Sequence, residues 1–292
     1  MVDVPRFWQN DAGDNGSVTS QRRVAHMNAD LDLNISRRQM LKLGSAVVAF
    51  AGLAGCARAS EANTDVTGII GAMENEVAAI KASMDDAQTT TMAGTDYISG
   101  TIGGTPVAVV QSGVGKVNAG ICAQTLISVF GAVRVINTGV AGSLTDELTI
   151  NDFVVSTDAV QHDFDVSAIG FKKGEIPYTG LVAFPADEAL RQQAVEAVRE
   201  AAPSSKVLEG RVCSGDQFVS TQEQVDAITS EFGGLCAEME GAAIAQVCYL
   251  NKTPYVIIRC ISDESDSMSY EEFQEAAAAE CANAVLTMVK SL

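Results

Sequence analysis

The chain has 292 residues, of which 47% are hydrophobic, and its 37 acidic against 19 basic side chains give a formal net charge of −18. A chain of this length can bury a substantial core in one large domain or two small ones. A surface this acidic repels phosphate backbones, so nucleic-acid binding is not expected.

Histidine and cysteine usage narrows the possible chemistry. Of the two histidines, His26 lies near the start of the chain and His162 in its body. One histidine cannot build the common kind of zinc site, and no GxSxG motif accompanies it to form a serine triad. We therefore expect His162 to have a structural or interfacial role. We also expect the protein to use no metal ion and no other cofactor. The cysteines after Cys56 lack CxxC spacing and have apolar neighbours, which favours buried thiols, although their even number leaves disulfides open.

The first part of the chain has the features of an export signal. Residues 1–32 are polar and irregular, which is typical of disorder, and Arg37-Arg38 then precede an apolar run over 43–53. That run is too short to span a bilayer but fits the core of a signal peptide, and the paired arginines resemble a twin-arginine signal. The run ends in Leu-Ala-Gly-Cys, which resembles a lipoprotein processing site with Cys56 as the lipidated residue.

These features divide the chain into a leader over 1–56, a short tether over 57–65 and one domain over 66–292. A lipidated Cys56 would hold the mature protein on the outer side of the cytoplasmic membrane. No later segment of the sequence is long and apolar enough to span a membrane. Two alternatives stay open: the arginine pair can precede a hydrophobic helix by chance, and initiation at Met27 would shorten the leader to a more usual length.

The domain is expected to alternate strands with helices. Strands are expected over 66–71, 92–102, 105–111, 133–137, 152–157, 207–214 and 255–261. Helices are expected from about 76 to 84, 117 to 130, 187 to 201, 221 to 231 and 270 to 290. A further helix is expected to carry Glu238 and Glu240 at its start and to stop at Lys252-Thr253-Pro254. This alternation predicts a three-layer α/β/α sandwich with a central mixed sheet, which includes a hairpin through Gly103-Gly104.

The stretch from Ala237 to Asp263 concentrates candidate functional side chains. It is expected to form a helix that begins with acids, a turn at Lys252-Thr253-Pro254, where proline stops the helix, and a buried strand over 255–261. Glu240 and Asp263 then lie at the edges of buried elements. A carboxylate in such a place needs a partner or a function, so we expect a site here.

Two turns and one loop add candidates. Glu76 lies at the start of a helix, where the helix dipole favours an acid, and this alone would explain it; alternatively, it projects over the carboxyl end of the sheet, where ligands bind in such folds. The turn from Ser112 to Lys116 (SGVGK) lacks the spacing of a phosphate loop, although its glycines allow close approach of a ligand. The loop over 161–177 is long and mixed in character, which is typical of functional or interfacial segments.

Taken together, these motifs resemble those of the 5′-methylthioadenosine/S-adenosylhomocysteine nucleosidases, within the purine and uridine phosphorylase superfamily. They are GIIGAMENEV from Gly68, SGVGK from Ser112, NTGVAGSL from Asn137, SGDQFV from Ser214, AEMEGAAIA from Ala237 and RCISD from Arg259. The resemblance covers residues 66–292 and implies a nucleoside phosphorylase-like fold. VAGSL, QHDFDVSA and GDQFV are most similar to the branch that also accepts aminodeoxyfutalosine.

The resemblance implies hydrolysis of the N-glycosidic bond of 5′-substituted adenosines, with release of adenine. Asp263 would protonate adenine at N7 and Glu76 would orient the attacking water, with Arg259 helping to hold them. Glu240 would accept hydrogen bonds from the ribose hydroxyls, with Met239 beneath the sugar. The other implied contacts are Phe218 and Val219 to adenine, and Met73, Val114 and Tyr270 to the 5′ substituent. In a homodimer, the partner subunit would contribute Val166, Ile169, Phe171 and Pro177.

The sequence departs from the family pattern in two positions and in its leader. Val140 stands where many relatives carry a serine beside the water, and Tyr270 stands where phenylalanine is usual, which adds a hydroxyl at the mouth of the 5′ pocket. Export differs from the usual cytoplasmic location of such enzymes. Two alternatives stand beside hydrolysis: a phosphorylase, in which Glu76 would repel phosphate, and a nucleoside-binding lipoprotein, which would need no proton donor at N7.

Overall fold

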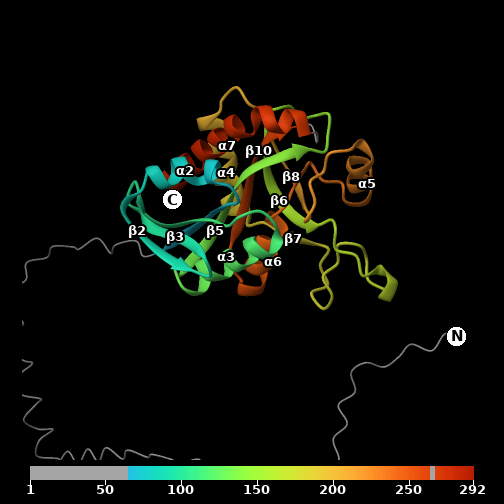
Figure 1. Cartoon of the computed structure of the whole chain (residues 1–292), viewed down its shortest axis with the longest axis horizontal. Coiled ribbons are helices and arrows are strands. Elements are labelled where there is room, and N and C mark those ends of the chain that lie inside the picture. The colour runs from blue at the N-terminus through green and yellow to red at the C-terminus, as the bar shows by residue number, and fades with distance from the viewer. Residues whose placement is uncertain (1–64, 264–266) are drawn as a thin grey trace, which may run out of the picture. The chain divides into compact units, whose positions relative to one another are not determined.

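The computed structural model describes residues 65–263 and 267–292, with side chains described from Tyr270 onward in the second segment (Figure 1). The predicted leader, Cys56 and all of the predicted tether except Asp65 lie outside these residues. Within the described part, no helix is both long enough and apolar enough to cross a membrane.

Strands and helices alternate along the described chain, as the sequence pattern predicts. The strands are β1 (Val66–Gly71), β2 (Asp85–Met92), β3 (Thr95–Ile102), β4 (Thr105–Gln111), β5 (Ala132–Ser143), β6 (Phe153–Gln161), β7 (Ala183–Pro185), β8 (Val207–Ser214), β9 (Cys236–Glu238) and β10 (Tyr255–Asp263). The helices are α2 (Glu74–Ala82), α3 (Lys116–Ser128), α4 (Glu188–Ala201), α5 (Gln222–Phe232), α6 (Gly241–Asn251) and α7 (Ser267–Lys290), with a short 3-10 turn η1 (Ser167–Ile169).

One mixed sheet contains all of these strands. Their order is β10-β6-β8-β9-β5-β1-β4-β3-β2, and β7 pairs with β6 beside this path. Because β10 also pairs in parallel with β5, the strands β5, β10, β6, β8 and β9 close into a ring, from which β1, β4, β3 and β2 extend. The expected α/β fold with a mixed sheet is confirmed. The closure of the ring is an additional feature, which the alternation of elements does not predict.

Helices cover both faces of the sheet (Figure 1). α7 packs against α2, α4, β5 and β10 on one face, whereas α3 packs against α6 on the other. Ile69 of β1 and Ile258 of β10 pack in the core cluster that contains α7 residues such as Val285. Their neighbours Ile70 and Ile257 pack in the cluster that contains α3 residues such as Leu126. Side chains alternate between the faces of a strand, so apolar residues at successive positions specify burial on both sides.

Several segments differ from the expected elements. β7 was not expected, β6 continues beyond the expected end at 157 to Gln161, and the expected strand over 92–102 is divided between the end of β2 and β3. The polar residues 85–91 gave no strand signal but form β2, an edge strand whose residues are almost all exposed. Residues 138–143, expected to be a turn, continue β5, because they pair with β10 and β9. The acids expected to begin a helix precede it instead: Glu238 ends β9, and Glu240 lies immediately before α6. The last two differences shape the site.

Candidate active site

A pocket opens where the carboxyl ends of the parallel strands β4, β1, β5 and β10 meet the ends of β8 and β9. It encloses about 610 Å³ of space free of protein atoms, a figure that includes part of the open solvent at its mouth. Every residue that the resemblance assigns to this subunit's part of the site lines the pocket. These residues are Met73, Glu76, Val114, Phe218, Val219, Met239, Glu240, Arg259, Asp263 and Tyr270.

Glu76 lies in the first turn of α2, and its carboxylate is fixed by backbone groups. Oε2 accepts hydrogen bonds from the N–H groups of Ala72 (2.6 Å) and Met73 (2.9 Å), and Oε1 accepts one from Val140 (3.0 Å). Glu76 thus caps its own helix, and the same bonds hold the carboxylate at the pocket wall. Burial raises the pKa of Glu76, although Arg259 and the three N–H groups oppose this shift.

The path of β5 leaves room for these charged groups. A Cβ atom at Gly139 would collide with Glu76 Oε1 and Arg259 Nη1, so glycine allows the strand to pass close beside them. Val140 follows and acts through its backbone: its N–H donates to Glu76, and its carbonyl oxygen accepts from Arg259 Nη1 (3.4 Å). The valine therefore still supplies a hydrogen-bond donor to the site, but from the main chain.

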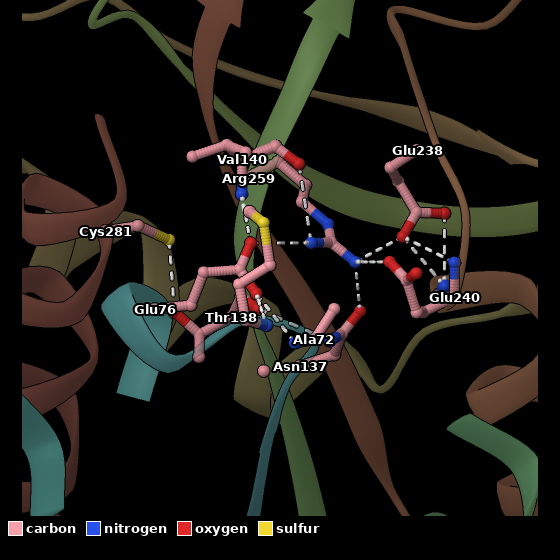
Figure 2. A network of polar contacts seen from close by, with 12 residues as sticks. Ala72, Glu76, Asn137, Thr138, Val140, Glu238, Glu240, Arg259 and Cys281 are labelled. Carbon is pink, nitrogen blue, oxygen red and sulfur yellow. Dashed lines mark hydrogen bonds and ion pairs between the residues drawn. The ribbon is translucent and has the colours of Figure 1, made fainter. Parts of the chain in front are cut away.

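Arg259 is a buried cation surrounded by acceptors (Figure 2). Its Nη2 donates to Asn137 Oδ1 (2.7 Å) and to Glu238 Oε2. Nη2 lies 3.7 Å from Glu240 Oε2, and Nη1 lies 3.9 Å from Glu76 Oε1. Although burial opposes its charge, the three glutamates raise the pKa of Arg259, so the guanidinium stays charged.

Glu238 is a site residue to which the sequence analysis gave no role. Besides Arg259, its oxygens accept hydrogen bonds from Ser214 Oγ and from the N–H groups of Glu240 (3.1 Å) and Gly241 (2.8 Å). Glu238 therefore fixes Arg259 and the start of α6 together. The sequence signal that could have identified Glu238 was Arg259. An arginine inside a buried strand requires buried carboxylates as partners, and the nearby AEMEG motif offers two.

Glu240 joins β9 to α6 and faces the turn before α3. Its Oε1 accepts a hydrogen bond from the N–H of Gly115 (2.8 Å). Burial and the nearby Glu238 raise the pKa of Glu240 to about 7, against the opposite effects of Arg259 and the Gly115 N–H. Glu240 is therefore a buried acid that changes charge near neutral pH, and its ionised form can accept hydrogen bonds from ligand hydroxyls.

Asp263 ends β10, beside Gly142 of β5. It is buried, and its Oδ2 accepts a hydrogen bond from Ser262 Oγ (2.8 Å). Because β10, β5 and β1 run parallel, Asp263 lies at the same edge of the sheet as the helix start that carries Glu76. Carboxyl groups from distant parts of the sequence thus reach one pocket.

Phe218 and Tyr270 form an aromatic wall of the pocket. Their ring centroids lie 5.2 Å apart in an edge-to-face arrangement. The hydroxyl of Tyr270 lies 3.4 Å from Met73 Sδ, and burial raises the pKa of this tyrosine, so the hydroxyl keeps its proton. The half-exposed Phe218 ring offers a flat apolar face to a planar ligand.

The four residues that the resemblance assigns to a partner subunit lie elsewhere. Val166, Ile169, Phe171 and Pro177 belong to the segment between β6 and β7, and none of them lines the pocket of its own chain. The side chain of Ile169 is 73% exposed. Their contribution to a second subunit stays a prediction.

The remaining candidates for cofactor chemistry are few in the described part of the chain. There, no group of three or more His, Cys, Asp or Glu side chains is placed to hold a metal ion. His162 follows β6, and burial lowers its pKa. The six cysteines in this part are buried free thiols.

Comparison with known proteins agrees with this geometry. Residues 66–290 match the family model of the phosphorylase superfamily. The chain is 42% identical over 207 residues to the 5′-methylthioadenosine/S-adenosylhomocysteine nucleosidase of Shewanella loihica, a match that covers 70% of this chain and 89% of that protein. It is 43% identical over 250 residues to the protein of the same name from Treponema pallidum, covering 77% and 93%.

Solved structures are similar as well. The nucleosidase of Neisseria meningitidis in complex with methylthio-immucillin-A has a TM-score of 0.75 and 37% identity, covering 78% of this chain and all of that one. The futalosine hydrolase of Helicobacter pylori has a TM-score of 0.74 and 34% identity, covering 78% and 99%. The fold is thus that of the phosphorylase superfamily. Within it, the chain belongs to the 5′-methylthioadenosine/S-adenosylhomocysteine nucleosidase family.

Proposed function

We propose that the chain hydrolyses the N-glycosidic bond of 5′-substituted adenosines and releases adenine. The observation that carries this proposal is the convergence of Glu76, Glu240 and Asp263 on one pocket beside Arg259. The similar proteins from Shewanella loihica, Treponema pallidum and Neisseria meningitidis are named as nucleosidases, which supports the same activity here. Acids chosen only for helix capping or solubility would have no reason to meet in one cavity.

Asp263 is the proposed general acid. Adenine is a poor leaving group as an anion, so protonation at N7 must accompany cleavage of the bond between C1′ and N9. The proton passes from the Asp263 carboxyl group to N7, and the electron pair of the broken bond goes to the base, which leaves as neutral adenine. Ser262 orients the carboxyl group by donating to Oδ2.

Glu76 is the proposed base for the attacking water. Loss of adenine leaves a positively charged, oxocarbenium-like ribosyl group, and water forms a bond to C1′ from the face opposite the base. The proton of the water passes to Glu76, whose raised pKa makes it a better proton acceptor than an exposed glutamate. The carboxylates of Glu76 and Glu240 also stabilise the developing positive charge.

The other lining residues bind and orient the nucleoside. Ionised Glu240 accepts hydrogen bonds from the ribose hydroxyls, and Met239 packs beneath the sugar. Phe218 stacks on adenine, and Val219 contacts the base through its backbone. Met73, Val114 and Tyr270 surround the 5′ substituent. The position of all of these residues at one pocket supports this assignment.

Hydrolysis is favoured over phosphorolysis because the cations near the pocket are already paired. Arg259 donates to Glu238 and Asn137, and the ammonium group of Lys116 donates to Asp163. A phosphate dianion would meet the carboxylate of Glu76 without a free cation among these groups, so repulsion would exclude it.

Adenine release by the full chain tests this activity. We expect adenine from methylthioadenosine in phosphate-free buffer, at a rate reduced about 100- to 10,000-fold in Asp263→Asn, which removes the general acid. Release that requires added phosphate would instead identify a phosphorylase. Tight binding of adenosine analogues without any release would identify a nucleoside-binding protein.

We propose methylthioadenosine, S-adenosylhomocysteine and aminodeoxyfutalosine as substrates. The similarity to nucleosidases and to a structure named futalosine hydrolase supports a 5′ pocket that admits groups of different size. The Tyr270 hydroxyl and the Met73 sulfur give this pocket both polar and apolar character. Comparison of kcat/KM for the three nucleosides tests the range.

We also propose that the protein acts as a homodimer. The exposure of Ile169, in the segment predicted to enter the partner's site, supports this assembly. Light scattering of the full chain should give twice the mass of one subunit. Ile169→Asp should produce monomers with reduced activity, and a wild-type chain that remains monomeric while fully active would contradict the proposal.

Finally, we propose export and anchoring through a lipidated Cys56. The support is the sequence pattern of paired arginines, apolar run and cysteine. Membrane fractionation of cells that express the full chain should recover it with the membranes, and Cys56→Ala should release it into the soluble fraction. Recovery of the wild-type chain in the cytoplasm would contradict this location.

A further inference from the structure

Lys116, which ends the SGVGK turn, has contacts that the reaction does not explain. Its Nζ donates to Asp163 Oδ1 (2.6 Å) and to Gln161 Oε1 (3.1 Å). The Lys116 side chain is 16% exposed and that of Asp163 is 21% exposed. The two side chains are thus partly shielded from water, although Asp163 as a whole residue is exposed. A charge-assisted hydrogen bond in that setting is stronger than one at an open surface.

Lys116, Asp163 and Asp216 form a closed ring of hydrogen bonds. The backbone N–H of Lys116 donates to Asp216 Oδ1 (2.8 Å), and the N–H of Asp216 donates to Asp163 Oδ2 (2.9 Å). The ammonium group of Lys116 closes the ring on the other oxygen of Asp163. Although burial opposes it, the hydrogen bonds from Lys116 and Asp216 lower the pKa of Asp163, so this carboxylate stays charged.

The ring joins two segments that line the pocket. Gly115 precedes Lys116 and donates its N–H to Glu240 Oε1 (2.8 Å), on the proposed ribose side. Phe218 and Val219 follow Asp216, on the proposed base side. The two segments lie close together, since a Cβ atom on Gly115 would stand 3.2 Å from Asp216 Oδ1. Gly115 has a φ of 99°, which favours glycine.

We propose that Lys116, Asp163 and Asp216 are positioning residues that hold the 215–219 loop in place for the adenine base. None of the three lines the pocket, so they act through Phe218 and Val219. The inference rests on the proposed function, which assigns the base to this loop. Asp216, Gln217 and Phe218 are all exposed, and without the ring the ligand itself must order them, which weakens binding.

Binding of adenine alone tests the ring without requiring catalysis. Calorimetry on the full chain should show a Kd for adenine that rises about tenfold in Lys116→Met, the loss expected for one partly buried charge-assisted hydrogen bond. The KM for methylthioadenosine should rise by a similar factor, while kcat changes less than about threefold, because Asp263 and Glu76 are untouched. A residue that only stabilised the fold would lower Tm without this split.

Two matched controls make the assignment specific. Asp216→Asn keeps an oxygen that can accept from the Lys116 N–H, so it should bind adenine like the wild type, whereas Asp216→Ala should behave like Lys116→Met. Lys173→Met removes the same charge from an exposed pair with Glu231 (3.8 Å), which lies outside the ring, and should leave the Kd unchanged.

Combining Lys116→Met with Asp163→Ala distinguishes a ring from separate contacts. If the three residues act as a unit, the double variant should bind adenine about as weakly as either single variant. If neither Lys116→Met nor Asp216→Ala changed the Kd for adenine, this inference would be overturned while the proposed function would stand. The same holds if the factor by which the double variant raises the Kd were the product of the two single factors. Absence of adenine binding by the wild-type chain would overturn the proposed function, and this inference with it.

Discussion

Arg259 lies at different distances from the three glutamates around it, and this difference divides their roles. Glu238 makes the direct hydrogen bond, while the nearest oxygens of Glu240 and Glu76 are 3.7 and 3.9 Å from the guanidinium. Glu238 therefore provides most of the pairing that a buried cation needs. Glu76 and Glu240 keep part of their hydrogen-bonding capacity for the ligand.

Glu238→Gln tests this division. The amide has one acceptor oxygen where Glu238 uses two, so its NH2 group would face the donors of Arg259 or of the α6 backbone. We expect kcat/KM to fall about 10- to 100-fold. The pKa of Glu240 should fall as well, because burial and then Glu238 raise it, so the acid limb of the pH profile should move to lower pH. An exposed control, Glu231→Gln, should change neither quantity, and an unchanged acid limb in Glu238→Gln would contradict the argument.

Tyr270→Phe tests the polar character of the 5′ pocket. Removal of the hydroxyl leaves the aromatic ring and its contact with Phe218, so methylthioadenosine should be hydrolysed at about the wild-type rate. We expect the ratio of kcat/KM for S-adenosylhomocysteine to that for methylthioadenosine to fall about threefold, as one hydrogen bond to a polar 5′ group is lost. The same ratio in both proteins would show that the hydroxyl does not select the substrate.

At the scale of elements, the long strand β5 brings the site together. It pairs with β1, β10 and β9, and at Gly139 it passes close beside both Glu76 and Arg259. A turn at 138–143, as sequence analysis expected, would separate the end of β10 from that of β9. The small residues in this stretch reflect close packing of a strand against charged side chains rather than a turn.

Gly139→Ala should therefore damage the site more than the fold. The added methyl group would displace Glu76 and Arg259, so we expect kcat to fall at least about 100-fold, with a loss of about 1–3 kcal/mol in the free energy of unfolding. Urea titration and steady-state kinetics measure the two effects. Gly120→Ala is the matched control: its Cβ would find ordinary contact at 3.9 Å, inside α3, and should leave activity unchanged. Full activity of Gly139→Ala would contradict the close approach.

At the scale of the whole molecule, the closed ring of strands buries acids that an open sheet would leave in solvent. β10 pairs with both β5 and β6, and Glu76, Glu238, Glu240 and Arg259 are all buried near the end of the sheet that carries the pocket. Burial disfavours the charged form of a carboxyl group, so the site adds a pH-dependent term to the stability of the fold.

The pH dependence of stability tests this cost of burial. The pKa of Glu240 rises from 4.5 to about 7 on folding, so between these values the folded chain binds more protons than the unfolded chain. The free energy of unfolding should therefore fall as pH increases from 5 to 8, by on the order of 2 kcal/mol from this residue. In Glu240→Gln the fall should be smaller by that amount, as measured by urea unfolding at several pH values. An identical pH dependence in both proteins would contradict the raised pKa.

Sequence reasoning identified most of the domain and part of the site. The apolar run over 255–261, which includes Ile257 and Ile258, predicted a buried strand, and the motifs brought Glu76, Glu240 and Asp263 into one hypothesis. It missed β2, because an exposed edge strand has no apolar face to signal it. It also gave no role to Glu238, because two acids separated by one residue look equivalent until the chain direction between β9 and α6 is known.

The sequence by itself determined the class of fold, the family and the residue types available for chemistry, because local periodicity and short motifs are properties of neighbouring residues. Tertiary structure alone decided which acid pairs with Arg259, how Lys116 is used, and that β10 closes on β5. These outcomes depend on distances between residues far apart in the chain. Such distances follow from how the strands pair and close into a sheet. Burial then determines which charged side chains require a partner of opposite charge.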